Sequence, residues 1–430
     1  MGIKSMIIKK RAKMKLDEEE IREFIFKYYK EEILDEQAAA LLTLMYTNEI
    51  SENEAVYLTQ AMAETGEELE LNRISNEIVD FHSIGGIGDK LIIILMSVMS
   101  SLGVPMAKIC GRELGMIDRL STIPGFRLDI ELENLKNQIS EIGEVIIAEP
   151  ENIAPIENKM YRLRNSIACN DNVPLIAISI MSQKVAVGSK NIVFDITCGK
   201  DAYVKNKNDA KKLAKYLIFI GKKLYKNVSC IISDLDEPLG NSFGNLLEIK
   251  EIVQCLNGYM TSDIYEMIVG IGCKIMAITE KEKDLNKSKQ MIINAINNGS
   301  AYNSFIKLID RQSGDIQFIN NISDIGNSKI VVPVLANSTG FVEKIDVDLI
   351  RSLGIYLGAI RSKKDDVIDY GSGIVLSKKI GEQVNIGEIL AYVHTNDDTK
   401  IKGAVDNLKN AFKISDKKVT KNSRILDFVN

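Results

Sequence analysis

The chain has 430 residues, of which 45% are hydrophobic and 26% charged, and its formal net charge is −5. This balance excludes a basic nucleic-acid-binding face over the whole chain, and the longest apolar run, residues 91–99, is too short to span a bilayer. We therefore expect no nucleic-acid partner and no membrane association. A chain of this length can bury more than one core, so two or three domains are expected.

The six cysteines are scattered without a C-x-x-C pair, and most lie in or beside apolar runs. This pattern predicts buried, reduced thiols in a cytoplasmic protein. Only two histidines, His82 and His394, are present, which argues against a multi-histidine metal site. The N-terminus carries charges from Lys4 onward and has no apolar segment, so we do not expect a signal peptide.

Residues 15–66 predict three consecutive helices, with apolar residues at helical spacing. Asp17 and Asp35 are expected to cap the first two, and Ser51 with Glu54 forms a capping-box pattern for the third. Residues 156–190 predict a second helical stretch. We expect this stretch to pack with residues 15–66, so that the chain crosses between two lobes more than once.

From Asn76 onward, strand patterns alternate with helix patterns. Strands are predicted at residues 76–80, 105–110, 144–148, 191–196 and 227–232, and helices at residues 91–102 and 209–224. This alternation predicts a parallel sheet with crossover helices. After Lys329, short strands with glycine turns predict a small β-rich unit.

The predicted fold class is therefore α/β, with two hinged lobes and a cleft between them. Residues 1–66 and 156–190 form a small all-helical lobe. Residues 76–155 and 191–329 form a larger α/β lobe with a parallel or mixed sheet. Residues 330–430 form a C-terminal α+β subdomain that is rich in strands.

The glycine-rich turn Gly85-Gly86-Ile87-Gly88 lies between a predicted strand and a predicted helix. Glycines let the backbone approach an anion, and a helix N-terminus offers unpaired N–H groups and a positive dipole end. The turn therefore fits a phosphate site. It fits a tight βα turn without a ligand equally well, and the local pattern leaves both readings open.

Segments spread over nearly the whole chain resemble the thymidine phosphorylase and pyrimidine-nucleoside phosphorylase family. Each segment is short, but their joint order makes a chance match very improbable. The segments are residues 7–11, 85–89, 123–126, Tyr161 with Arg164, residues 174–176, 179–180, 244–245 and 366–370.

The resemblance implies a helical lobe and an α/β lobe that close on a hinge, and a homodimer formed through the helical lobe. It implies a pentosyltransferase that splits a pyrimidine nucleoside (thymidine or uridine) with phosphate, giving the free base and pentose-1-phosphate. Phosphate is then the co-substrate, and no cofactor is required. Lobe closure aligns the reactants and excludes water.

On the base side, the resemblance assigns catalytic roles to His82, Arg164 and Ser179. The family's lysine position carries Gln183, which can donate a hydrogen bond but brings no positive charge. Lys184 is the next residue, yet one step along a helix is a rotation of about 100°, so we do not expect it to take the lysine's place.

On the phosphate side, the substrate-binding candidates are Ser83, Gly85 and Gly86, which the resemblance keeps, and Lys90, which differs from the family residue. Four phosphate contacts of the family are lost. They correspond to Phe81, Ile92, Cys110 and a segment missing after Gly115, and we expect apolar groups in part of this pocket. Lys90, Arg112 or Lys200 are the cations that would compensate.

Some family members bind a potassium ion near the hinge. The positions that match its ligands are Gly88, Leu239, Ser242 and Glu251, and a threonine ligand of those members is Lys90 here. We hypothesise that the Lys90 ammonium occupies the place of the ion and pairs with Glu251.

Two functions stay open at this stage. One is an active pyrimidine-nucleoside phosphorylase whose phosphate handling is impaired. The other is a non-catalytic relative that binds a nucleoside or a partner protein.

Overall fold

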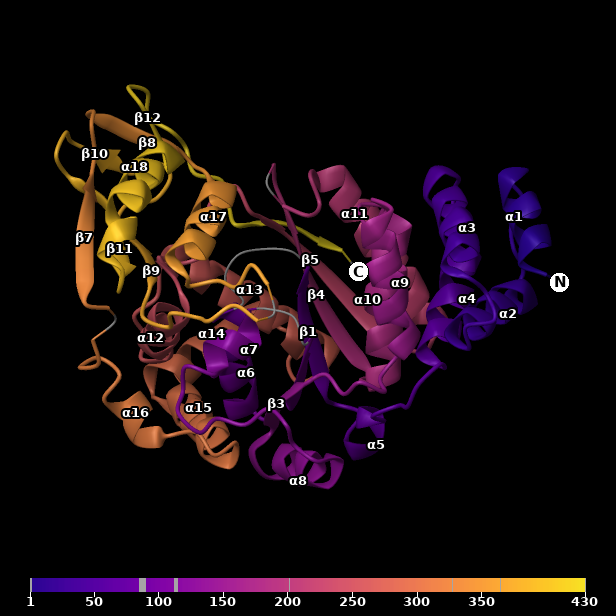
Figure 1. The fold of residues 1–430 in the computed structure, drawn as a ribbon. Coiled ribbons are helices and arrows are strands. Elements are labelled where there is room, and N and C mark those ends of the chain that lie inside the picture. The colour runs from indigo at the N-terminus through magenta and orange to yellow at the C-terminus, as the bar shows by residue number, and fades with distance from the viewer. Residues whose placement is uncertain are drawn as a thin grey trace.

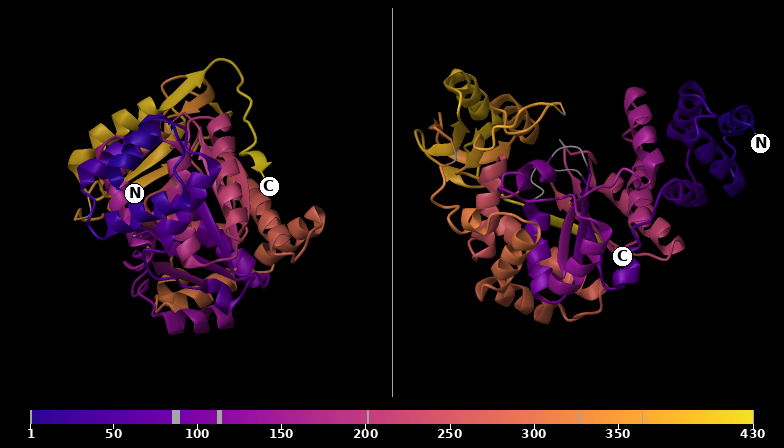
Figure 2. Two further views of the ribbon diagram at one scale, coloured as in Figure 1. Left: turned by 90° about the vertical axis from the view of Figure 1, so that its right-hand side faces the viewer. Right: turned by 60° about the horizontal axis from the view of Figure 1, so that its bottom comes forward.

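The fold is organised around a six-stranded sheet, with an N-terminal group of helices at one end of the molecule and a β-rich region at the other (Figure 1). The structure, a computed structural model, describes residues 2–84, 90–111, 115–200, 202–326, 328–363 and 365–429. The right-hand view in Figure 2 shows the same separation between the N-terminal helices and the β-rich region.

The helical lobe contains the first four helices and two later ones. They are α1 (Ile3–Arg11), α2 (Glu18–Tyr29), α3 (Asp35–Thr47), α4 (Glu52–Ala63), α9 (Pro155–Ser166) and α10 (Val173–Val187). The α10 helix packs on α4, and α9 contacts α2, α3 and α4. Met160 of α9 and Ile176 of α10 are buried in the same apolar cluster as Phe24 of α2.

The helix caps follow the sequence patterns with one exception. Asp17 accepts a hydrogen bond from the Glu20 backbone and Ser51 forms a capping box with Glu54. The expectation that Asp35 caps its helix is wrong, because Leu34 is the N-cap and Asp35 is the first helical residue. The Asp35 carboxylate instead accepts a hydrogen bond from the Tyr28 hydroxyl at 2.9 Å.

The main sheet has the strand order β13-β5-β4-β1-β2-β3. Its members are β1 (Val79–Ile84), β2 (Met106–Cys110), β3 (Glu144–Ala148), β4 (Asn191–Cys198), β5 (Asn227–Asp234) and β13 (Ile425–Val429). All neighbours are parallel except β13, which runs antiparallel to β5. β1 stays paired with β4 as far as Ile84, so the strand continues beyond its predicted end at residue 80 and includes His82 and Ser83.

Helices cover both faces of this sheet. On one face pack α6 (Lys90–Ser101), α12 (Asn245–Leu256), α13 (Ser262–Ile278), α14 (Leu285–Asn297) and α15 (Ser300–Arg311). On the other face, α11 (Lys207–Lys223) and the helical lobe share one core with β4 and β5. Short helices complete the region: α5 (Leu71–Ile74), α7 (Met116–Leu120), α8 (Leu132–Ile142) and α16 (Ile316–Asn320).

The β-rich region has its own core and two small sheets, β10-β8-β12 and β6-β9-β11-β7. Its elements are β7 (Ile330–Leu335), β8 (Gly340–Ile345), α17 (Val347–Leu357), β9 (Gly373–Leu376), β10 (Gln383–Val384), β11 (Ile389–Thr395), the 3-10 helix η1 (Asp398–Lys400), α18 (Ile401–Ala411) and β12 (Phe412–Ser415). Two strands tie it to the α/β region. β6 (Ser242–Phe243) pairs with β9, and β13 returns to the main sheet.

All six cysteines are buried, as predicted, and none of them forms a disulfide bond. Among the residues that the structure describes, no helix is both long enough and apolar enough to traverse a bilayer.

Candidate active site

The base-side residues meet at one buried carboxyl group, that of Glu157 in the first turn of α9. The Ser179 hydroxyl donates to Glu157 Oε1, and Gln183 Nε2 lies 3.3 Å from Glu157 Oε2. The nearest guanidinium nitrogen of Arg164, Nη2, lies 3.7 Å from Glu157 Oε1. Ser179 and Gln183 are four residues apart on α10, so they share one face of that helix. The structure thus brings these three predicted residues together.

This cluster is largely removed from water. Glu157 and Arg164 are each 4% exposed. Desolvation raises the pKa of Glu157, against the hydrogen bond from Ser179 and the charge of Arg164, and it lowers the pKa of Arg164. Arg164 Nη1 donates to the Leu175 carbonyl oxygen at 2.8 Å. The guanidinium also lies 5.8 Å from the centre of the Tyr161 ring, so packing and hydrogen bonding both fix its position.

Lys184 points away from this cluster, as the helix rotation predicts. Its ammonium forms a bidentate pair with Asp80 on β1, with Nζ 2.9 Å from Oδ1 and 2.7 Å from Oδ2. Both side chains are buried. Two neighbouring residues of α10 therefore have different partners. Gln183 contacts Glu157 in the base-side cluster, and Lys184 forms an ion pair with Asp80 of the central sheet.

His82 lies on the face of the sheet that the helical lobe covers. It is two residues after Asp80 on β1, so the two side chains share a face, and its ring meets Phe194 edge-on at 5.9 Å. Burial first, and then the charges of Lys184 and Lys108, lower its pKa well below 6.5. The imidazole is therefore neutral at neutral pH and offers one N–H donor and one acceptor.

Ser83 faces the opposite side of the sheet, and its hydroxyl lies 3.4 Å from Asp195 Oδ2. The other oxygen of Asp195 accepts a hydrogen bond from Ser233 at 2.5 Å. The predicted substrate-binding glycines Gly85 and Gly86, together with Gly88 and Arg112, lie outside the described residues.

The positions where the family resemblance placed lost phosphate contacts are part of the hydrophobic core. Phe81, Ile92 and Cys110 are buried in one cluster with Met116, which follows the missing segment. Cys110 Sγ lies 3.2 Å from Met116 Sδ. Lys200, one of the cations considered as a replacement, is exposed, and its backbone N–H points to Asp236. These positions therefore offer no hydroxyl or charged group to an anion.

Lys90 is fully buried at the start of α6, with 0% exposure. Its ammonium donates to the Ser242 carbonyl oxygen at 2.7 Å and contacts the Glu251 carboxylate. Glu251 also accepts from the backbone N–H groups of Asn241 at 2.7 Å and Ser242 at 3.1 Å. Leu239 is buried in the same segment. Within the described ranges, no group of three or more His, Cys, Asp or Glu residues could hold a metal ion.

Sequence reasoning missed three residues of this region: Glu157, Asp80 and Lys108. Glu157 precedes Arg164 by seven residues, or about two helical turns, which places both on one helix face and could have identified it. Asp80 and Lys108 lie on strands, and only the tertiary structure brings them to their partners. Asp80 pairs with Lys184, and Lys108 Nζ lies 3.3 Å from the Phe81 carbonyl oxygen.

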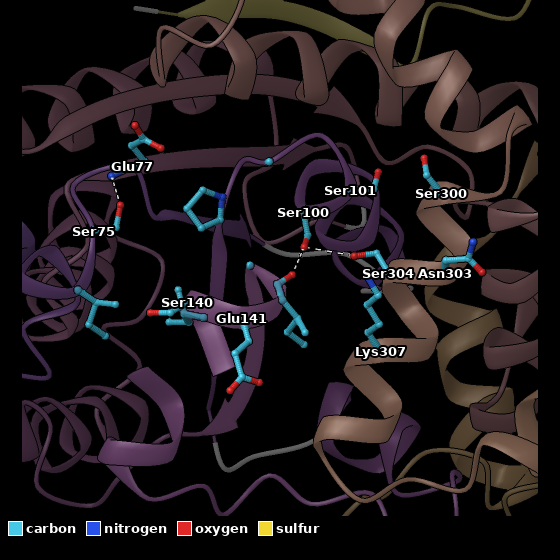
Figure 3. A pocket seen from close by; sticks show the side chains of 16 residues that line it. Ser75, Glu77, Ser100, Ser101, Ser140, Glu141, Ser300, Asn303, Ser304 and Lys307 are labelled. Atoms are coloured by element: carbon cyan, nitrogen blue, oxygen red, sulfur yellow. Dashed lines mark hydrogen bonds between the residues drawn. The ribbon is translucent and has the colours of Figure 1, made fainter. Parts of the chain in front are cut away.

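A separate cavity of about 650 Å³ lies where β2 and β3 begin, and Figure 3 shows its lining. Six serines line it together with Glu77, Glu141, Asn303 and Lys307. None of the predicted site residues that the structure describes is part of this lining. The cavity is therefore distinct from the base-side cluster.

Three family models match the chain, in the order of its structural parts. The helical bundle domain of a glycosyl transferase family matches residues 4–66, and the a/b domain of that family matches residues 75–302. The pyrimidine nucleoside phosphorylase C-terminal domain matches residues 341–415.

Curated relatives match over nearly the full length. A pyrimidine-nucleoside phosphorylase of Staphylococcus epidermidis is 36% identical over 400 residues, which is 92% of each chain. One of Geobacillus stearothermophilus is 35% identical over 410 residues, covering 94% of this chain and 95% of the relative. The crystal structure of anthranilate phosphoribosyltransferase from Thermus thermophilus shares the fold, with a TM-score of 0.58 at 14% identity, over 71% of this chain and 99% of that one.

Proposed function

Because this chain belongs to the pyrimidine-nucleoside phosphorylase family, we propose that it catalyses the phosphorolysis of a pyrimidine nucleoside. The products are the free base and pentose-1-phosphate, and phosphate is the co-substrate. The observation that carries this proposal is the meeting of Arg164, Ser179 and Gln183 at one buried point of the helical lobe. The alternative of a non-catalytic relative is not favoured, because similarity to named phosphorylases extends over 92% of the chain.

In this proposal the helical lobe, residues 1–66 and 156–190, holds the base and closes over the α/β lobe, residues 76–155 and 191–329. His82 and Arg164 donate hydrogen bonds to the base as it leaves with negative charge, and Ser179 and Gln183 bind its edge. A neutral His82 suits this role, because a neutral imidazole donates from one nitrogen without needing to be protonated.

Phosphate is bound weakly in this proposal. Ser83, the glycine turn and the N-terminus of α6 are the parts that remain to hold it. Lys90 stands at that helix N-terminus, but its charge is balanced by Glu251. The buried side chains of Phe81, Ile92 and Cys110 bring no hydroxyl or charged group to this side of the site.

We further propose that Lys90 replaces the potassium ion of some relatives. Its ammonium carries the same charge and bonds to the Ser242 carbonyl oxygen and the Glu251 carboxylate, two of the four positions assigned to the ion. The protein then needs no potassium. A homodimer formed through the helical lobe and a cytoplasmic location belong to the same proposal.

Phosphorolysis is tested directly by incubating the purified protein with uridine or thymidine, with and without phosphate, and following free base. We expect phosphate-dependent release that Arg164→Ala abolishes. The matched control is Arg162→Ala on the same helix, because Arg162 lies outside the base-side cluster. Base release that is independent of phosphate, or that Arg164→Ala leaves intact, contradicts the proposal.

A further inference from the structure

We propose that Glu157 is a positioning residue that sets the direction of the hydrogen bonds in the base subsite, and that it thereby selects pyrimidines with an N3–H group over 4-aminopyrimidines. The inference rests on the proposed function, because it assigns specificity to the same subsite. It concerns recognition of the base and does not require turnover.

The first step is the single proton of the Ser179 hydroxyl. A serine hydroxyl can donate one hydrogen bond and accept two, and Ser179 donates its proton to Glu157. Glu157 lies behind Ser179, since the carboxylate is 4% exposed and the serine is partly exposed. The side of Ser179 that a ligand meets is therefore an acceptor only.

The second step is the amide of Gln183. One hydrogen of Nε2 is directed at Glu157 Oε2, 3.3 Å away, and this contact fixes which end of the amide carries the nitrogen. The Nε2 amide carries a second hydrogen, and we assign it to a ligand. Ser179 and Gln183 lie one turn apart on α10, so the carboxylate behind them orders an acceptor and a donor side by side.

The third step is the match with a base. Uracil and thymine carry N3–H beside a carbonyl oxygen, which pairs with the Ser179 acceptor and the Gln183 donor. Cytosine carries a lone pair at N3 and an amino group at C4, so acceptor meets acceptor and donor meets donor. Unmade hydrogen bonds at a desolvated site cost about 10- to 100-fold in affinity.

Arg164 explains why a carboxylate is tolerated here. Desolvation raises the pKa of Glu157, whereas its contacts with the Arg164 guanidinium, the Ser179 hydroxyl and the Gln183 amide favour the ionised form. An ionised carboxylate has no proton to give, so it can only accept. A neutral amide at this position would donate as well as accept and would release the hydroxyl from its fixed direction.

The test is calorimetric titration of uridine and cytidine, without phosphate, into the wild-type protein and the Glu157→Gln variant. Glu77→Gln is the matched control, because Glu77 is an exposed glutamate at the separate cavity. We expect the wild type and the control to bind uridine about 10- to 100-fold more tightly than cytidine. In Glu157→Gln this ratio falls by about tenfold, chiefly through tighter binding of cytidine.

An unchanged ratio in Glu157→Gln overturns the inference, and so does a wild type that lacks a preference or binds neither nucleoside. If Glu157→Gln does not fold, Ser179→Ala takes its place, and the ratio must then fall through weaker uridine binding. Phosphate-dependent base release is assayed separately. A protein that shows the selectivity shift without turnover contradicts the proposed function alone, and one that turns over without the shift contradicts this inference alone.

Discussion

Glu144, the first residue of β3, gives a prediction that tests the buried electrostatics of the α/β region. Its side chain is 0% exposed. In the described part of the chain its carboxyl oxygens contact the hydroxyls of Ser304 at 2.8 Å and Ser97 at 3.5 Å. Ser304 also bonds to Ser100 on the wall of the separate cavity, as Figure 3 shows. Two hydroxyls compensate a buried charge only in part, so burial raises the pKa of Glu144 to about 7.

The sign and size of the effect follow from this pKa. Below pH 4.5 the carboxyl group is protonated in both folded and unfolded chains, so it adds no penalty. As the pH rises to about 7, the unfolded chain ionises while the folded chain resists, and folding becomes less favourable. The rise from the ordinary 4.5 to about 7 corresponds to roughly 3 kcal/mol of lost stability above pH 7.

Glu144→Gln removes this charge and keeps the shape. We expect the variant to gain stability over the wild type as the pH rises, by almost nothing at about pH 3.5, by about 0.8 kcal/mol at pH 5 and by about 3 kcal/mol at pH 8.5. Urea unfolding at several pH values measures the difference. Glu141→Gln, an exposed change on the adjoining α8 helix, is the control and should stay within about 0.5 kcal/mol at every pH. A gain for Glu144→Gln that does not vary with pH would refute the reasoning.

Three further predictions concern the site itself. Lys90→Met leaves the buried Glu251 carboxylate without its cation and should lower the free energy of unfolding in urea by about 3–5 kcal/mol, most of which the double variant Lys90→Met/Glu251→Gln restores. Replacing sodium with potassium should change neither the stability nor the activity of the wild type. A potassium requirement would contradict the role given to Lys90. Because the pKa of His82 lies well below 6.5, the pH profile of kcat/KM should show no inflection from this residue between pH 6 and 8. The variant His82→Asn should lower kcat by about 10²-fold. An inflection near pH 6.5 that disappears in His82→Asn would count against a neutral imidazole. The KM for phosphate should exceed that of the Geobacillus stearothermophilus relative by at least about 100-fold, because each lost hydrogen bond to phosphate is worth about 1.5–3 kcal/mol. The KM values for the nucleoside should agree within about tenfold. Equal KM values for phosphate would show that other groups have rebuilt the anion site.

Local patterns in the sequence predicted the five parallel strands of the main sheet and three of the N-terminal helices, because the causes of these elements are local. The capping box of Ser51 and Glu54 and the apolar run of β3 have the expected bounds. Elements that depend on distant partners were less predictable. The extension of β1 to Ile84 comes from its pairing with β4, and β13 exists only because β5 offers an edge to residues 425–429.

The candidate site shows the same division. The rotation of about 100° per helical residue predicted that Gln183 and Lys184 point in different directions. In the structure Gln183 contacts Glu157, and Lys184 pairs with Asp80. The role of Glu157 was not predicted, because its spacing from Arg164 indicates only a shared helix face and does not reveal its contacts with Ser179 and Gln183 on the second helix. The contact of Lys90 with Glu251 joins residues 161 positions apart, and only the family resemblance suggested it.

The antiparallel strand β13 has a consequence for how the chain matures. It covers β5 at the edge of the main sheet, and it follows every other strand of that sheet in the chain. Until β13 has been synthesised, the nascent sheet therefore presents β5 as an open edge, the kind of surface on which chains aggregate. A chain in which residues 425–429 are deleted would carry this open edge permanently. Removing β13 should therefore lower yield through aggregation, even though every residue of the base-side cluster is retained.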